Sequence, residues 1–469
     1  MTGPIVPQRA VLVLPTPAEF ASRTYRIASA LVHRGHDVTV MARVRAGLPA
    51  EELHPAGYRI VRVPVAAIDG LPLPGLVRAV RVGIRHIHAW RTRTPYRPIP
   101  PVGSVAAGDG GASGSAAPEP GDQAPTPTAG VDERRASWPR RTASGMVRRL
   151  AVPLTIRAQA RSTRGRAPAA DLYHGMAYMG IPIALELGKR HHGRVVYDAR
   201  DIYMDAANLA RMRGPMRWLI ARAERGWARR ADRVITVNRP YAEVMARRWD
   251  VPLPLIVMNC AYRYRLSDPA PRRFHAALGL DPAVRVVLYQ GGFSRDRGIE
   301  QLLAAIPDVP GAVLVLLGYG MLREELEARI AEPALAGLVH IVPAVPPTEL
   351  LDWVASADVV AMPIQPTTLN HRLTTPNKLF EAIAAGVPVV ASDLPGMAPT
   401  VREADAGLLV NPTDPAAIAA ACRALLDEAP DAAAARRASI REAAARTLNW
   451  ETQLEVLLGE YGRLTGRPW

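Results

Sequence analysis

Short apolar runs alternate with stretches of helical periodicity through the first half of the chain. Residues 10–14 (AVLVL) predict a buried strand, residues 22–34 a helix and residues 38–42 a second strand. Later apolar runs predict further strands at residues 58–63, 171–173, 194–197 and 233–237. Strands that alternate with helices are typical of a parallel sheet covered by helices, so this half is predicted to be a Rossmann-like domain.

The same alternation starts again beyond residues 256–268, which we interpret as a linker between two domains. The second series of predicted strands lies at residues 284–289, 312–317, 339–342, 358–362, 387–391 and 407–410. Residues 450–464 predict a last helix. The chain is therefore assigned to the α/β class, with Rossmann-like domains at residues 1–262 and 263–449 and a C-terminal helix within residues 450–469.

Residues 95–147 interrupt this pattern because they are rich in Pro, Gly, Ser and Ala and hold almost no large apolar side chain. Such a segment cannot bury enough apolar surface to fold, so a disordered insertion is predicted here. The chain as a whole is 49% hydrophobic, which is typical of a globular protein. It has no run of about 18 apolar residues that would predict a transmembrane helix, and its first residues lack a signal-peptide pattern.

The formal net charge of +15 indicates an acidic partner, such as nucleic acid, anionic lipid or a phosphate-bearing substrate. All basic side chains except Lys189, Lys378 and the histidines are arginines, so a codon bias toward Arg is an alternative explanation. The basic residues are scattered and aromatic residues make up 5% of the chain, so no nucleic-acid partner is expected.

The two cysteines, Cys260 and Cys422, are too few and too far apart to predict a disulfide framework or a zinc site, and a cytoplasmic location is expected. Residues 78–97 and 216–233 mix Arg with large apolar side chains. Two interpretations remain open: amphipathic helices on an anionic membrane, or core-packing helices with Arg-rich outer faces. The first would place the protein on the inner face of the plasma membrane.

Residues 375–393 (TPNKLFEAIAAGVPVVASD) predict a helix followed by a buried strand. Pro376 suits the first helical turn, where its missing N–H is not needed. Leu379 begins a set of apolar positions at helical spacing, and Gly386 is predicted to end the helix.

The polar residues of this helix predict a phosphate site. Asn377 and Lys378 lie in the first turn, where free backbone amides and a cation favour a phosphate. Glu381 lies one turn deeper, where a carboxylate can accept hydrogen bonds from two sugar hydroxyls. Together these residues predict a pocket for a nucleoside diphosphate with its ribose.

The segment resembles the donor-binding helix of the retaining glycosyltransferases of family 4, the glycosyl transferases group 1. The resemblance implies the GT-B fold, in which two Rossmann-like domains face each other across a cleft and the last helix crosses back to the first domain. It also implies that Glu381 holds the ribose of a nucleotide-sugar. The family usually has another Glu eight positions earlier, close to the transferred sugar, where this chain has Leu373.

Residues 290–298 (QGGFSRDRG) follow the first predicted strand of the second domain. Gly291 and Gly292 would let backbone amides approach a phosphate closely, and Arg295 and Arg297 could pair with a diphosphate. A Gly-Gly pair is also typical of a simple turn, but the neighbouring helix makes us favour phosphate binding. The segment resembles the family's loop in which two cations neutralise the leaving diphosphate. The predicted catalytic residues are therefore Arg295, Arg297, Lys378 and Glu381.

Other strand ends of the second domain are expected to complete the donor site. At Gly318 a tight turn and a direct ligand contact are both open, and the resemblance implies that the backbone at Val342 frames the nucleobase. Residues 367–375 are polar, and Asn370 and His371 either line the sugar site or belong to a solvated loop. The predicted donor contacts are Gly291, Gly292, Gly318, Val342, Pro376, Asn377 and Leu379.

Polar residues that follow strands of the first domain predict an acceptor side of the cleft, because ligands of open α/β sheets bind beyond the carboxyl ends of strands. His174 is either a cleft residue or a capping group. Arg200 stands where the resemblance implies a His, with Asp201 after it; Arg cannot act as a base at neutral pH, so Arg200 is expected to hold a phosphate or an anionic acceptor. Arg23 and Arg26 either contact the acceptor or a phosphate, or lie on the solvated face of their helix.

These features predict a retaining glycosyltransferase that moves a sugar from a UDP- or GDP-sugar to a hydroxyl acceptor, such as a lipid-linked or cell-envelope glycan. No Asp-x-Asp motif follows a predicted strand at the cleft, so neither a metal nor another cofactor is expected. Basic side chains and the helix dipole would stabilise the departing diphosphate instead. Two alternatives remain open: a nucleotide-sugar epimerase of the same fold, and a non-catalytic nucleotide-sugar-binding protein.

Overall fold

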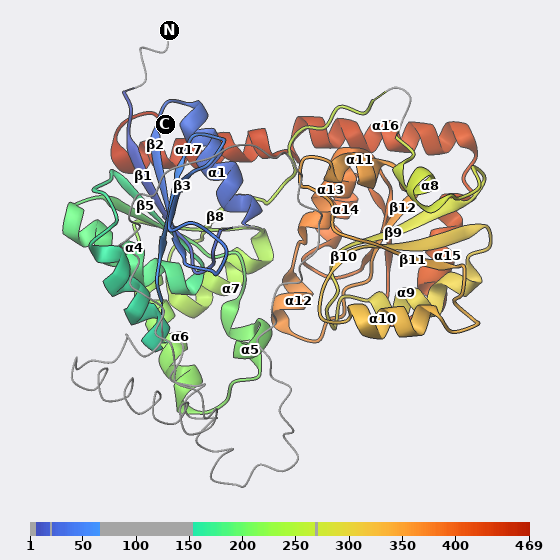
Figure 1. The fold of residues 1–469 in the computed structure, drawn as a ribbon, viewed down its shortest axis with the longest axis horizontal. Helices are drawn as coiled ribbons and strands as arrows, with labels where there is room; N and C mark the ends of the chain where they lie inside the picture. The colour runs from blue at the N-terminus through green and yellow to red at the C-terminus, as the bar shows by residue number, and fades with distance from the viewer. Residues whose placement is uncertain (1–5, 19–20, 66–152, 268–270) are drawn as a thin grey trace, which may run out of the picture. The chain divides into compact units, whose positions relative to one another are not determined.

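The computed structural model describes residues 6–18, 21–65, 153–267 and 271–469. Two sheets organise these residues, one in each half of the chain, as the sequence predicts (Figure 1). The predicted insertion at residues 95–147 and the basic stretch at residues 78–97 lie outside the described residues. No helix of the described ranges is long and apolar enough to cross a membrane.

The first sheet has eight strands in the order β3-β4-β2-β1-β5-β6-β7-β8. All neighbours are parallel except β3, which runs antiparallel to β4. The short β3 and β8 were not predicted, because runs of three and two residues are too short to show an apolar pattern. The strands are β1 (Arg9–Val13), β2 (Asp37–Arg43), β3 (Glu51–Leu53), β4 (Arg59–Val63), β5 (Leu172–Met176), β6 (Arg194–Asp198), β7 (Arg233–Thr236) and β8 (Leu255–Ile256).

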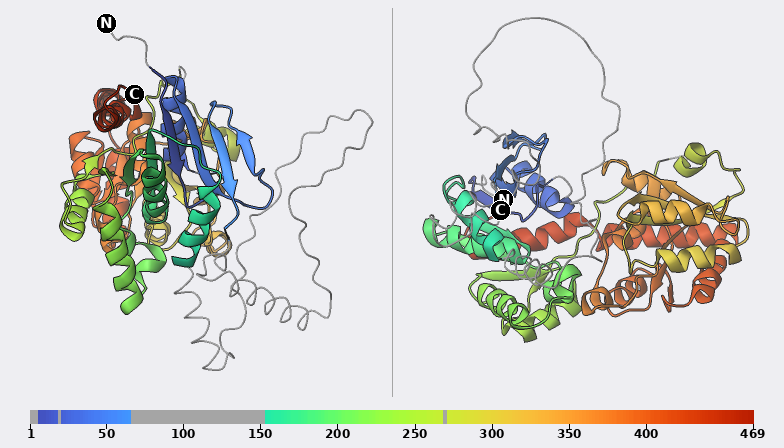
Figure 2. Two further views of the ribbon diagram at one scale, coloured as in Figure 1. Left: turned by 90° about the vertical axis from the view of Figure 1, so that its left-hand side faces the viewer. Right: turned by 60° about the horizontal axis from the view of Figure 1, so that its bottom comes forward.

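Helices cover both faces of each sheet (Figure 2). In the first half α1 packs against β2, and α4 packs against β5 and β6. The apolar positions at helical spacing explain this packing, because each helix presents one apolar stripe to the sheet. The labelled helices of this half are α1 (Ser22–His33), α4 (Ala177–His191), α5 (Ala207–Ala210), α6 (Pro215–Ala228) and α7 (Arg239–Trp249), with a short 3₁₀ helix at Tyr203–Asp205. Residues 153–164 are helical as well.

The second sheet has six parallel strands in the order β11-β10-β9-β12-β13-β14. The chain turns to opposite sides of the central strand β9, first to β10 and later to β12. Ligands of open α/β sheets bind at such a reversal of strand order. The strands are β9 (Arg285–Gly292), β10 (Ala312–Tyr319), β11 (Val339–Val342), β12 (Val359–Met362), β13 (Val389–Ser392) and β14 (Gly407–Val410).

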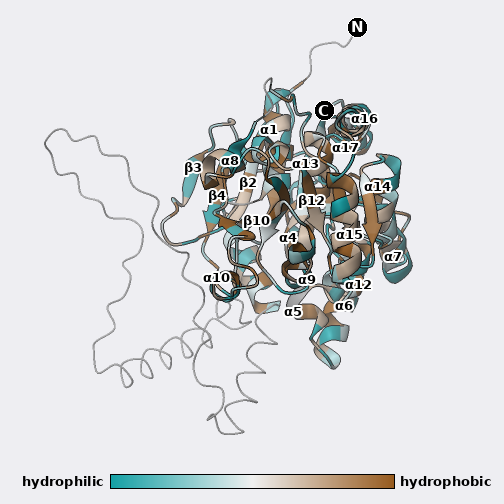
Figure 3. Ribbon diagram, turned by 90° about the vertical axis from the view of Figure 1, so that its right-hand side faces the viewer, coloured by the Kyte–Doolittle hydropathy of each residue, from teal (hydrophilic) through white to brown (hydrophobic). Residues whose placement is uncertain are grey.

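The apolar strands of this sheet lie between two hydrophobic clusters, one on each face. Figure 3 shows strand β12 in the hydrophobic colour. The helices of this half are α8 (Arg273–Leu278), α9 (Ile299–Ala305), α10 (Arg323–Ile330), α11 (Leu350–Ala355), α12 (Leu369–Leu373), α13 (Asn377–Ala385), α14 (Ala398–Glu403), α15 (Pro415–Leu426), α16 (Pro430–Arg446) and α17 (Trp450–Thr465).

The last helix, α17, belongs to the core of the first sheet rather than of the second. Its residues Trp450, Leu457 and Tyr461 are buried in one cluster with Leu12 and Val40 of strands β1 and β2. The preceding α16 instead packs against α13 of the second half. The chain therefore changes from one core to the other between these two helices.

Several strands continue further than their apolar runs predict. Strand β5 includes His174, and β9 and β10 continue to Gly292 and Tyr319. Gly291 pairs with Gly318 across these two strands. A Cβ atom on Gly318 would lie 2.1 Å from the carbonyl oxygen of Gly291, so the glycines themselves allow the strands to stay paired there.

Candidate functional site

The helix α13 forms where its sequence pattern predicts it. Leu379 and Ile383 are buried in the core, and Gly386 ends the helix in the left-handed conformation with φ 68°. One detail of the prediction was wrong: Pro376 is not in the first turn but is the preceding cap, because its ψ of 149° is extended. The first residues of the helix, Asn377 and Lys378, lie beside the end of strand β9.

The ammonium group of Lys378 lies in an unusual place. Its Nζ atom lies 3.6 Å from the centroid of the Tyr289 ring, is buried, and has no hydrogen-bond partner among the described residues. Burial and, to a smaller extent, the charge of Arg297 lower the pKa of Lys378 to about 7, although the charge of Glu381 opposes the change. A buried cation without a hydrogen-bonded acceptor is costly, so this geometry suits an incoming anion.

The carboxylate of Glu381 lies one turn deeper on the same helix. Gln290 of strand β9 donates a hydrogen bond from Nε2 to its Oε2 at 2.6 Å. Burial raises the pKa of Glu381, whereas Arg26, Lys378 and the hydrogen bond from Gln290 lower it. The amide therefore orients one carboxylate oxygen.

The two predicted arginines of the loop after β9 differ in their surroundings. The charge of Arg297 lowers the pKa of both Lys378 and His371, so it lies close to the start of α13 and to α12. The side chain of Arg295 is 71% exposed and lies 3.7 Å from Glu325 of α10. The charge of Arg297 thus acts on Lys378, whereas the side chain of Arg295 lies near Glu325 of α10.

The other predicted donor residues could contact a ligand with their backbone atoms rather than with polar side chains. Gly291 and Gly318 have φ values of 121° and 153°, which favour glycine. The side chain of Leu379 is buried in the core, and Val342 is the nearly buried last residue of β11. Gly292 is exposed at the end of β9.

The polar segment before α13 is not a solvated loop, because residues Leu369–Leu373 form the helix α12. Asn370 is buried and joins the two halves of the chain. Its Oδ1 accepts hydrogen bonds from the Ile202 N–H and the Tyr241 hydroxyl at 2.8 Å each, and its Nδ2 donates to Asp201 at 3.1 Å. Asn370 is therefore engaged by the protein itself.

His371, the next residue, is half-buried, and burial lowers its pKa. Its Nδ1 lies 2.9 Å from the Thr367 hydroxyl. Arg200 is also partly buried, and its Nε atom has no hydrogen-bond partner among the described residues. Burial lowers the pKa of Arg200, but Tyr203, Asp198 and Asp201 raise it by more, so this guanidinium is held charged.

Two predictions for the first domain were wrong. Arg23 does not lie on a solvated face; it is buried, and its Nε donates to Asp198 at 2.7 Å. His174 is neither exposed nor a cap; it lies inside β5, with Nε2 3.2 Å from Asp198 and Nδ1 bonded to the Tyr461 hydroxyl of α17. These side chains pair with one another inside the core, which a strand-end position in the sequence does not reveal.

Tyr289 and Gln290 were not predicted as site residues. The Tyr289 ring makes a cation–π contact with Lys378, and the Tyr289 hydroxyl donates to the carbonyl oxygen of Gly292 at 2.9 Å. Gln290 orients Glu381. Their position directly before the Gly-Gly pair is the one signal in the sequence that could have identified them.

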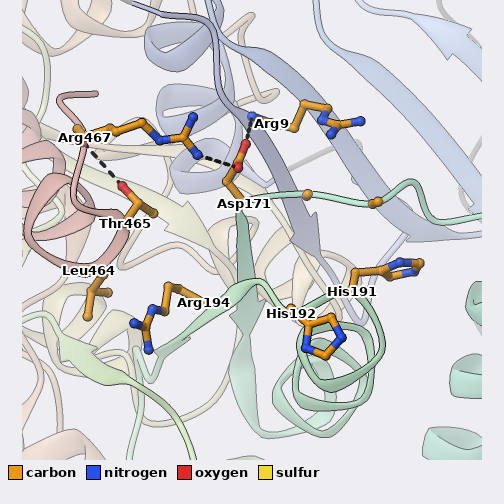
Figure 4. Close-up of a pocket in the computed structure, with 10 residues that line it drawn as sticks. Arg9, Asp171, His191, His192, Arg194, Leu464, Thr465 and Arg467 are labelled. Carbon is orange, nitrogen blue, oxygen red and sulfur yellow. Dashed lines mark hydrogen bonds and ion pairs between the residues drawn. The ribbon is translucent and has the colours of Figure 1, made fainter.

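A basic hollow of about 250 Å³ lies at the amino ends of strands β1 and β6 (Figure 4). Asp171 joins the Arg9 N–H at 2.8 Å to the Arg467 guanidinium at 2.9 Å. His191 lies in the last turn of α4, where a helix dipole favours basic side chains. The hollow lies at the amino edge of its sheet, whereas ligands of such sheets bind at the carboxyl edge, so we do not place the site here.

Known proteins resemble this chain in the sequence of its second domain and in its fold. Residues 284–428, which include β9, α12 and α13, match the family model described as Glycosyl transferases group 1. A D-inositol 3-phosphate glycosyltransferase of Thermobispora bispora is 28% identical over 229 residues, which cover 46% of this chain and 52% of that relative. The chain spans about half the length of the relatives that it matches.

Solved structures match nearly the whole chain. Sucrose-phosphate synthase from Thermosynechococcus elongatus has a TM-score of 0.67 and 20% identity, covering 98% of this chain and 99% of that one. Anabaena HepE in complex with UDP has a TM-score of 0.61 and 14% identity, covering 97% and 100%. The chain therefore has the GT-B fold, and residues 284–428 of its second domain match the model of the glycosyl transferases group 1 family.

Proposed function

We propose that the protein is a glycosyltransferase that moves a sugar from a nucleotide-sugar to a hydroxyl group of an acceptor, with retention of the anomeric configuration. One observation carries the proposal: the start of α13 brings two groups to the reversal point of the second sheet. They are the buried ammonium of Lys378, which has no hydrogen-bond partner among the described residues, and the oriented carboxylate of Glu381. A diphosphate would satisfy the ammonium and the free amides of the helix, and a ribose would satisfy the carboxylate.

The donor we propose is a UDP-sugar. The Anabaena HepE structures with UDP and with UDP-glucose support this choice, because their fold matches this chain over nearly its whole length. Backbone contacts with a base leave no side-chain pattern in the sequence. A titration with UDP, GDP and ADP would therefore decide the base directly.

In the proposed reaction, the bond between the anomeric carbon and the diphosphate oxygen breaks, and the acceptor oxygen bonds to that carbon from the same face. The acceptor's proton passes to the departing phosphate oxygen. Lys378, Arg297 and the amides of α13 would stabilise the charge that develops on the diphosphate. Neither a metal ion nor another cofactor is assigned a role in this step, and activity in the presence of EDTA tests that assignment.

Incubation of the protein with UDP-glucose and a panel of acceptors, including inositol phosphates and lipid-linked glycans, tests the proposal. A glycosylated acceptor with the donor's anomeric configuration is expected, and Lys378→Met should abolish its formation. An inverted product would contradict the retaining reaction. Conversion of the donor without any acceptor would identify an epimerase instead, and tight UDP binding without turnover would favour a binding protein.

We also propose that the protein works at an anionic membrane surface. On α6 the side chains of Trp218 and Leu219 are 61% and 49% exposed, and the Arg222 guanidinium lies 5.7 Å from the Trp218 ring centroid. Exposed aromatic and basic side chains on one helix favour an interface with anionic lipid. Cosedimentation with phosphatidylglycerol vesicles is expected for the wild type and weaker for Trp218→Ser; equal binding to phosphatidylcholine vesicles would contradict the proposal.

A further inference from the structure

Arg26 lies in the second turn of α1, on the first sheet, and its guanidinium is buried against the linker between the two halves. Its Nη2 donates to the Asn259 side-chain oxygen at 2.8 Å, and its Nη1 donates to the carbonyl oxygen of Cys260. The guanidinium also lies 5.3 Å from the Trp450 ring centroid. The side chain is therefore bonded within the protein and does not lie on a solvated helix face, which was one of the two sequence interpretations.

The hydrogen-bond acceptors of Arg26 within the described ranges are all neutral oxygens, of Ser22, Asn259 and Cys260. Its neighbour Arg23 differs, because it contacts the carboxylate of Asp198. A buried charge with neutral partners is costly, and an apolar side chain would fill the same space against Trp450. The positive charge of Arg26 therefore calls for a reason beyond packing.

The contacts of Asn259 suggest a reason for the buried charge of Arg26. Its oxygen accepts from Arg26, and its Nδ2 donates to the side-chain oxygen of Asn377. Asn377 is the first residue of α13, and Lys378 follows it. A continuous hydrogen-bonded chain thus runs from a helix of the first sheet to the start of the helix that carries the proposed nucleotide site.

The positive charge of Arg26 also acts on Glu381 of the same helix, α13. Among the groups that counter the rise in the pKa of Glu381 on burial, Arg26 has the largest effect, ahead of Lys378 and of the hydrogen bond from Gln290. An ionised carboxylate offers only acceptors to the two ribose hydroxyls, whereas a protonated one is also a donor. The charge of Arg26 favours the ionised form, although burial raises the pKa of Glu381 overall.

We propose that Arg26 is a positioning residue for the nucleotide site: through Asn259 it holds the start of α13. The inference rests on the proposed function only in that α13 binds a nucleotide. It assigns a role in nucleotide binding to a residue of the first half of the chain, where the sequence suggests an acceptor contact.

The test measures the dissociation constant of UDP by calorimetry between pH 5.5 and 8.5 for wild type, Arg26→Met, Arg26→Lys and Asn259→Leu. Arg62→Met is the matched control, because Arg62 is another buried arginine of the first sheet and its partners are Glu52 and two loop carbonyls. Arg26→Met should weaken UDP binding by about tenfold, the effect of losing a charge-assisted hydrogen bond. Asn259→Leu should also weaken it, whereas Arg62→Met should leave the constant unchanged.

The pH profile separates a positioning role from a loss of packing. Without Arg26 the pKa of Glu381 rises, so UDP affinity should begin to fall at a higher pH than in the wild type as the pH is lowered. Arg26→Lys keeps the charge and should restore the wild-type profile. Wild-type affinity and pH profile in both Arg26→Met and Asn259→Leu would overturn the inference alone. Absence of UDP, GDP and ADP binding to the wild type would overturn the proposed function and this inference together.

Discussion

Arg23 of the first half and Lys378 of the second half are both buried cations, but their surroundings differ. In the first, Arg23 and His174 both contact the carboxylate of Asp198, at 2.7 and 3.2 Å, so the charges compensate one another inside the core. In the second, the ammonium of Lys378 has no hydrogen-bond partner among the described residues, and the nearby Arg297 lowers its pKa further. Polar residues at strand ends thus indicate a ligand only where the fold leaves their charge unpaired.

The largest effect is expected in the first sheet. Asp198→Ala leaves Arg23 buried without its carboxylate and should lower the free energy of unfolding by about 3–5 kcal/mol. Urea denaturation of the variant and the wild type measures this difference. A loss below about 1 kcal/mol would mean that the pair is not the structural anchor that its geometry suggests.

Lowering the pH should also weaken the pairing of Arg23 with Asp198. Burial raises the pKa of Asp198, but Arg23 and His174 lower it by more, so its pKa lies well below the usual range in the folded protein. Because the pKa is depressed by folding, the stabilisation is present above the unfolded value near about 4 and is lost as the pH falls below it.

Lys378→Met should have the contrary effect at neutral pH. Removing a buried ammonium that has no hydrogen-bond partner in the described part of the chain should leave the thermal midpoint unchanged or raise it, while UDP binding weakens roughly 10- to 100-fold. Thermal unfolding and UDP calorimetry on the same sample measure both quantities. If the variant instead unfolds as readily as Asp198→Ala, the contrast between the two sheets is wrong.

A smaller effect on stability is expected where Gly318 pairs with Gly291 across strands β9 and β10. In Gly318→Ala the new Cβ would lie 2.1 Å from the Gly291 carbonyl oxygen, so β9 and β10 must separate, at about 1–3 kcal/mol. Gly292→Ala is the control, since its Cβ would meet no atom closer than the Tyr319 carbonyl oxygen at 4.0 Å. Equal thermal midpoints for the two variants would show that the close approach of the strands is not needed.

The smallest effect is expected for Arg295→Ala. Arg295 is 71% exposed and 3.7 Å from its acidic partner, so its loss should change the free energy of unfolding by less than about 0.5 kcal/mol. UDP affinity should also stay close to that of the wild type, whereas Arg297→Ala should reduce it. If calorimetry showed that Arg295→Ala weakens UDP binding more than Arg297→Ala does, the catalytic role that the sequence suggests for Arg295 would be supported instead.

The sequence predicts most of the second domain because its signals are local. Gly386 ends α13, and the residues Asn377, Lys378 and Glu381 follow one another at the start of that helix. The contacts of the first domain could not be predicted in this way. Arg23 and Asp198 are 175 positions apart in the chain, and His174 meets Tyr461 across 287 positions. Only the folded sheet shows that these side chains pair with one another and not with a ligand.

The central claim is that the start of α13 holds the diphosphate of the donor, and proton uptake on UDP binding tests it most directly. In the free protein the pKa of Lys378 is lowered to about 7, so most of the ammonium is deprotonated at pH 8. A diphosphate beside it would raise that pKa. Calorimetry at pH 8 in buffers of different ionisation enthalpy should therefore show proton uptake for the wild type and none for Lys378→Met. UDP binding with equal proton uptake in both proteins would contradict the account.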